Sequence, residues 1–134
     1  MLNHLINMNI IELNKGIQIK HNNGDIVNVE EIPITHEFAD QIYIRKMIMQ
    51  KGQVVAGAKH KHKHVWFLIK GKVTIKENNE VVDHIAPCYT ISKPGAKRII
   101  YAHEESVFIN IHKNPDNIKN IKELEKQIVE LWHS

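Results

Sequence analysis

The 134-residue sequence has one cysteine, few aromatic residues and no long apolar run. The single Cys88 cannot form a disulfide within the chain, which favours a reducing, cytoplasmic location. No stretch approaches the roughly 20 consecutive apolar residues that span a bilayer, so we expect no membrane association. These absences are typical of an ordinary globular protein.

A strong charge of one sign is also missing. The sequence carries 18 Lys and Arg against 15 Asp and Glu, for a net charge of +3. The basic residues are scattered among acidic ones instead of forming a patch, which argues against nucleic acid as a partner. The catalytic motifs of hydrolases and the glycine-rich phosphate loop are not found at their usual spacing.

Short apolar stretches separated by turns dominate the middle of the chain. Between residues 40 and 113, segments rich in Ile and Val alternate with turns such as Lys51-Gly52, Lys70-Gly71 and Pro94-Gly95. Turns about every 8–12 residues are typical of an antiparallel sandwich or barrel and not of βαβ units. The sequence therefore predicts an all-β domain.

The two ends of the chain read differently. In residues 1–35 we expect only short strands, or an arm, around a turn at residues 22–25. In residues 114–134, apolar side chains recur at steps of three and four after Asp116, which can cap a helix. We expect one domain, with the barrel in residues 36–113. The apolar stripe of the helix would cover the barrel or form a dimer contact.

Histidine is the residue that the sequence has in excess. Ten are present, and three alternate with lysines as His60, His62 and His64. Alternate residues of a strand share a face, and converging neutral imidazoles bind transition metals. Residues four apart on a straight strand are roughly 13 Å apart, too far to share one ion. His60 and His64 can meet at a metal only if the chain bends between them.

The histidine segment resembles the first motif of the cupin superfamily. That motif is Gly, five residues, His-x-His, three or four residues, Glu, six residues and Gly, and its spacing fits from Gly52 to Gly71. Ala58 stands at the first His position and His64 at the Glu position, while His60 matches the second His. The resemblance implies a jelly-roll type β-barrel with a divalent transition metal, Zn, Fe, Mn or Ni. His62 is then a candidate third ligand, or it faces solvent if the strand is bulged.

A second cupin motif matches only in part. Gly95 fits with Pro94 beside it, but Arg98 stands at the His position and Ala102 at the Asn position. A cation opposes metal binding there, but it binds carboxylate or phosphate well. We therefore regard Arg98 or its neighbour Lys97 as a candidate for holding a small anionic ligand.

Other candidates are less specific. Tyr43 and Tyr101 are candidate pocket residues. We expect His112 to end a strand at the surface, and a turn at residues 103–105 to be charged because it is solvated.

Small cupin-like proteins of tailed phages and some bacteria resemble this chain more closely. The compared stretches are residues 35–38, 42–45, 93–98 and 101–105. The likeness implies a virion-associated location if the protein is phage-encoded, but no reaction.

Three function classes remain open from the sequence. The first is a binding protein for a metal, a small acid or both. The second is a metal-dependent enzyme of dioxygenase or isomerase type, and the third is a phage-type accessory or structural protein without catalysis. We expect a homodimer, because small cupins associate through sheet edges that would otherwise be exposed.

Overall fold

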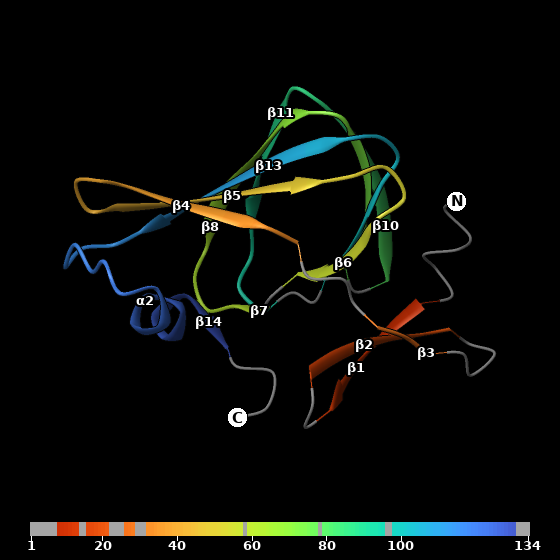
Figure 1. Cartoon of the computed structure of the whole chain (residues 1–134), viewed down its shortest axis with the longest axis horizontal. Coiled ribbons are helices and arrows are strands. Elements are labelled where there is room, and N and C mark those ends of the chain that lie inside the picture. The colour runs from red at the N-terminus through yellow and green to blue at the C-terminus, as the bar shows by residue number, and fades with distance from the viewer. Residues whose placement is uncertain are drawn as a thin grey trace.

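A computed structural model of the chain gives a β-barrel with one short helix beside it (Figure 1). The structure describes residues 8–13, 16–21, 26–28, 32–57, 59–77, 79–95 and 98–130, with side chains for the described residues from 32 to 129. Within these ranges the strands before the barrel are β1 (Met8–Leu13), β2 (Gly16–His21) and β3 (Ile26–Asn28). They form an antiparallel three-stranded sheet. The turn predicted at residues 22–25 lies outside the described residues.

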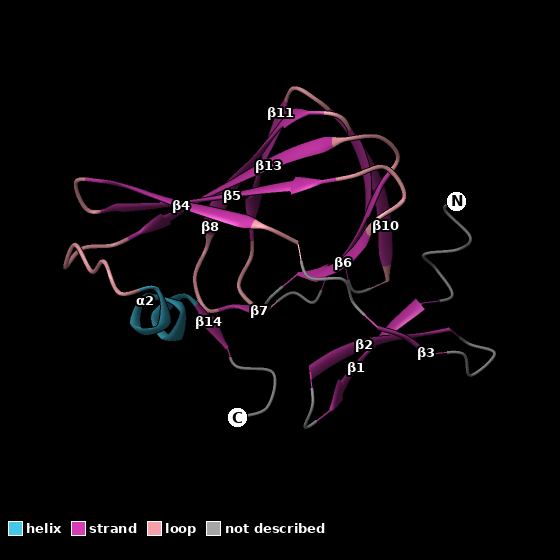
Figure 2. Ribbon diagram, in the orientation of Figure 1, coloured by secondary structure: helices cyan, strands magenta, loops and turns pink. Residues whose placement is uncertain are grey.

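The barrel consists of two antiparallel sheets that face each other (Figure 2). The five-stranded sheet has the order β11 (Cys88–Ser92), β8 (His64–Lys70), β13 (Ser106–Lys113), β5 (Ile42–Met49) and β4 (Ile34–Ala39). The four-stranded sheet has the order β10 (Glu80–Ile85), β9 (Lys72–Glu77), β12 (Arg98–Ala102) and β6 (Val54–Gly57). The all-β prediction is therefore confirmed.

The hydrophobic core lies between the two sheets. Alternate residues of each strand point inward, so both sheets contribute side chains to one buried cluster. Trp66, Leu68 and Phe108 come from the five-stranded sheet, and Val73 and Ile100 from the four-stranded sheet. Each is less than about a tenth exposed. Both sheets therefore share one apolar core.

The C-terminal helix begins later than the sequence predicted. Helix α2 spans Ile121–Ile128, and its N-cap is Asn120, whose side chain accepts a hydrogen bond from the Glu123 N–H. Asp116 does not cap it, because the Asn114 side chain bonds both the N–H and the C=O of Ile118 and holds the chain in a turn. The expectation for Asp116 was wrong because this contact competes locally with the helix.

The helix packs over one end of the barrel, as Figure 2 shows. Leu124, Ile128 and Val129 are buried in one cluster with Tyr43 of β5. After the helix, β14 (Val129–Glu130) pairs with the two-residue strand β7 (Lys59–His60). In the part of the chain that the structure describes, we find no helix with the length and apolar character that a bilayer crossing requires.

Candidate metal centre

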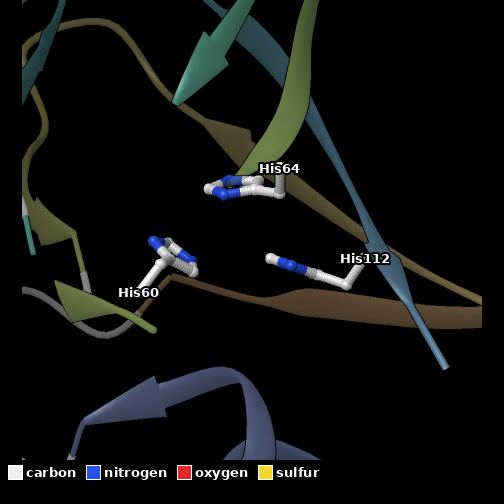
Figure 3. Close-up of side chains that lie close together, drawn as sticks. All are labelled: His60, His64 and His112. Carbon is white, nitrogen blue, oxygen red and sulfur yellow. The ribbon is translucent and has the colours of Figure 1, made fainter. Parts of the chain in front are cut away.

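Three histidines meet at the end of the barrel that α2 covers. His60 lies on β7, His64 begins β8 and His112 lies on β13. One ring nitrogen from each can be chosen so that all three lie within 4.8 Å of one another. Figure 3 shows the three rings turned toward a common point. Neighbouring imidazoles in this arrangement are a typical transition-metal ligand set.

The chain brings His60 and His64 together by bending between them. The residues Lys61 and His62 form a bend that separates β7 from β8, so the two histidines are not on one straight strand. The ring centroids of His60 and His64 are therefore only 4.2 Å apart. Backbone bonds hold the bend, because the Lys61 N–H donates to Ile128 O at 2.8 Å. The bend that the sequence required for a shared site is confirmed.

His62 does not join the cluster, and His112 takes the third place. His62 is exposed in the bend. His112, which we expected at the surface, is only 5% exposed, so that expectation was wrong. The strand β13 places Phe108, Asn110 and His112 on one face, and Phe108 is in the core. This alternation was the signal in the sequence that could have identified His112.

The cluster belongs to a polar layer across the inner face of the five-stranded sheet. The strand register aligns inward-facing residues in rows. One row is apolar and contains Cys88, Leu68, Phe108, Met47 and Ile34. The next row contains Thr90, Trp66, Asn110, Arg45 and His36. The row nearest α2 contains Ser92, His64, His112, Tyr43 and Phe38. Two of the three metal-binding candidates, His64 and His112, therefore lie in the polar part of this face.

Burial keeps these histidines in the neutral form that metals require. Desolvation, followed by the charges of the other histidines, Arg98 and Arg45, lowers the pKa of His60 to about 2. Desolvation is also the main cause that lowers the pKa of His112 to about 3 and the pKa of His64 in the same direction. At neutral pH the imidazoles do not need to lose a proton before they bind a metal.

A hydrogen bond fixes which nitrogen of His64 is available. His64 Nε2 lies 2.9 Å from Asn110 Oδ1, which only accepts, so Nε2 carries the hydrogen and Nδ1 carries the lone pair. His64 Nδ1 and His112 Nε2 are buried without a hydrogen-bond partner among the described residues. Buried nitrogen atoms without a partner are costly unless a ligand satisfies them. The residues present therefore fit a transition-metal ion.

A cavity of about 190 Å³ adjoins the cluster inside the barrel. Most of its lining is apolar, and the polar contributions come from His60, Asn110, Arg45 and Arg98. The apolar lining residues are Ile34, Met47, Val55, Ala56, Gly57, Trp66, Ile75, Ile100 and Phe108. An apolar pocket with a few convergent polar groups is the usual form of a small-molecule site.

Of the four residues predicted to bind a ligand, the structure places one at the cavity and two away from it, and does not describe the fourth. Arg98 lines the cavity, but its Nε donates to Glu77 Oε2 at 3.3 Å. Lys97 lies outside the described residues. Tyr43 lies outside the cavity, where it is fully buried, stacks on His112 with ring centroids 6.0 Å apart and shares a hydrogen bond of 2.5 Å with His36 Nδ1. Tyr101 lies on the face of β12 opposite Arg98 and packs edge-on against His103.

Comparisons with known proteins support the fold. No family model matches the sequence, and no curated protein is similar to it. A conserved protein with a double-stranded β-helix domain from Klebsiella pneumoniae is 19% identical, with a TM-score of 0.56 over 66% of this chain and 81% of its own. A cupin superfamily protein from Desulfitobacterium hafniense is 10% identical, with a TM-score of 0.54 over 65% of this chain and 81% of its own.

A dioxygenase also shares the architecture. A variant of salicylate 1,2-dioxygenase from Pseudoaminobacter salicylatoxidans is 10% identical, with a TM-score of 0.58. The match covers 72% of this chain but only 29% of the dioxygenase. At these identities the likeness concerns the fold and not the activity. With its two facing antiparallel sheets and these structural neighbours, the chain has the cupin fold.

Proposed function

We propose that the protein binds one divalent transition-metal ion through His60, His64 and His112. The observation that carries this proposal is the convergence of three neutral imidazoles, those of His64 and His112 buried and that of His60 partly buried, with nitrogen atoms within 4.8 Å of one another. Three protein ligands leave at least one coordination position for water or a small ligand. His60 lines the cavity, so that position would face a largely apolar space.

The charge around the site favours a small anion as a second ligand. The three histidines are neutral, so the site itself does not offset the charge of a bound cation. The guanidinium groups of Arg45 and Arg98 add positive charge near His60 and help to lower its pKa. Because like charges repel the metal, a bound anion would relieve the repulsion. The proposed function is therefore a binding protein for a metal and a small acid.

Elemental analysis of untagged protein, purified without added metal, tests the metal proposal. We expect Zn, Fe, Mn or Ni close to one ion per chain, and loss of the ion in His60→Ala and in His64→Ala. His62→Ala is the matched control, because this histidine belongs to the same segment but is exposed. Folded wild-type protein that contains none of these metals and takes up none on addition would contradict the proposal.

A metal-dependent enzyme is the second candidate. The observation that favours it is the apolar cavity beside His60, which could hold a substrate next to an open coordination position. When bound there, a metal would supply Lewis-acid or oxygen chemistry. The test is turnover of small aromatic or aliphatic acids that a chelator abolishes and added metal restores. Full metal occupancy without turnover of any tested acid would leave the binding function alone.

A further inference from the structure

The two arginines that line the cavity differ in their partners. Arg98 is only 7% exposed at its side chain and forms an ion pair with Glu77 at 3.3 Å. Among the described residues, the ion pair of Arg45 is a long contact of 3.9 Å to Glu125, which is 40% exposed. Its buried Nε has no hydrogen-bond partner in the described part of the chain. Glu77 and Glu125 are exposed to a similar extent, at 37% and 40%, so the two arginines differ mainly in how closely the acid approaches, and the charge of Arg45 is the less closely compensated.

A second hydrogen-bond donor lies beside Arg45. Asn110 is directly opposite Arg45 in the pairing of β13 with β5, and both residues line the cavity. The oxygen of Asn110 accepts the bond from His64, and the two N–H donors of its amide group remain for a ligand. A guanidinium and an amide on neighbouring strands match the two oxygen atoms of a carboxylate.

The rest of the cavity sets the size and character of the ligand. Its remaining surface is formed mainly by aromatic and aliphatic side chains, including Trp66, Phe108 and Ile100. A dry cavity of about 150 Å³ is known to hold benzene. The volume of about 190 Å³ therefore has room for one six-membered ring, or an aliphatic chain of similar size, with a carboxylate attached.

We propose that this cavity binds a small apolar monocarboxylate, with the carboxylate on Arg45 and Asn110 and the apolar body against Trp66 and Phe108. Arg45 takes the role that the sequence suggested for Arg98. This inference deepens the proposed function, because it names the class of acid for the same pocket. It rests on the part of the proposed function that concerns binding of an acid. It does not require the metal, since Arg45 and the apolar walls are present whether or not a metal binds.

Calorimetric titration of the full chain with benzoate and with benzamide tests the proposal. The two probes have nearly the same size, but only benzoate is charged. We expect benzoate to bind at least about tenfold more tightly than benzamide, because a charge-assisted bond to a guanidinium is stronger than a neutral one. In Arg45→Met the advantage of benzoate should disappear, and in Arg45→Lys part of it should remain.

A matched control removes the other arginine together with its partner. The double variant Glu77→Gln/Arg98→Met deletes the ion pair as a unit and leaves the net charge of the protein unchanged. We expect its affinity for benzoate to stay within about twofold of the wild type. A loss of benzoate binding in this control, with normal binding in Arg45→Met, would place the anion on Arg98 and overturn the proposal. Equal affinities of benzoate and benzamide in the wild type would overturn it as well, and that comparison needs no variant to fold.

The same titrations separate this inference from the metal proposal. Each is performed on the protein as purified and again after chelator treatment, with metal content measured in parallel. Binding of benzoate that depends on Arg45 in metal-free protein, together with no uptake of metal, would support the inference and contradict the metal proposal. Stoichiometric metal without any binding of benzoate would support the metal proposal and contradict the inference.

Discussion

His64 and His112 lie opposite each other on neighbouring antiparallel strands, with their ring centroids 4.5 Å apart. The register that pairs Ile111 with Val65 places them in this position, one residue further along each strand. Directly opposite residues on one face have the shortest cross-strand distances in a sheet. The pairing of β8 with β13 therefore forms two thirds of the proposed site, and the bend after β7 adds His60.

Substitution of His112 should remove the metal as effectively as substitution of His60. We expect His112→Ala to weaken zinc binding by about 100-fold or more, since loss of a partner that only supports a ligand already costs 10–100-fold. Competition with a chromophoric zinc chelator measures the affinity. His62→Ala should leave it unchanged. Equal affinities of His112→Ala and the wild type would remove this residue from the site.

Asn110 should act on the metal through His64. In Asn110→Leu the acceptor for His64 Nε2–H is lost, and we expect zinc affinity to fall by about 10–100-fold. Asn110→Asp keeps an acceptor and adds a negative charge, so the affinity should be retained or increased. The same competition assay provides the values. If both variants weakened binding equally, the hydrogen bond to His64 would not be the cause.

Acid should destabilise the metal-free protein through its buried histidines. The pKa of His60 is lowered to about 2 and that of His112 to about 3, below the ordinary value of 6.5 in the unfolded chain. Below pH 6.5 these two histidines are therefore protonated in the unfolded chain but stay neutral in the folded protein. The free energy of unfolding should fall by about 1.4 kcal/mol per pH unit for each histidine as the pH drops from 6.5 toward 4, and these two residues should cause little change above pH 7.

Urea denaturation at several pH values measures this dependence. The double variant His60→Gln/His112→Gln is the control, and its unfolding free energy should vary less with pH between 6.5 and 4. A wild-type profile as flat as that of the variant would mean that the histidines are protonated without cost in the folded state.

Binding of the metal and of the acid should reinforce each other. A carboxylate on Arg45 reduces the positive charge that opposes a metal at His60, and linkage requires the effect to be reciprocal. We expect saturating benzoate to tighten zinc binding about fivefold or more, and zinc to tighten benzoate binding by the same factor. Calorimetry in both orders of addition checks the equality. In Arg45→Met the coupling should be lost, whereas weaker zinc binding in the presence of benzoate would show direct competition.

Two glycines of the motif spacing should respond differently to alanine. Both Gly52 and Gly71 have positive φ angles, +86° and +95°. A methyl group at Gly71 would collide with Ser106 and with the backbone of Glu105, whereas at Gly52 it would meet open space. Gly52→Ala should cost about 1–2 kcal/mol for the left-handed backbone, and Gly71→Ala more than about 4 kcal/mol. Thermal and urea unfolding compare the two variants, and similar losses would show that sterics at Gly71 are relieved by movement of the turn.

The sequence alone determined the class of fold and part of the site. Turn spacing and the short apolar segments between the turns predicted an antiparallel sandwich or barrel, because each depends only on local backbone geometry. The distance argument also showed that His60 and His64 need a bend between them, and the structure has one. The likeness to phage proteins and the homodimer remain predictions.

The tertiary structure decided which residues complete the site. His112 became the third candidate ligand because the register of β13 against β8 places it opposite His64, and register between strands distant in the chain is not encoded in local pattern. From the sequence only Arg98 and Lys97 were candidates for the anion, and only packing showed that Glu77 pairs with Arg98 while the buried Nε of Arg45 has no partner among the described residues. Local periodicity assigns a side chain to a face of its own strand, whereas its partners depend on which strands fold against it.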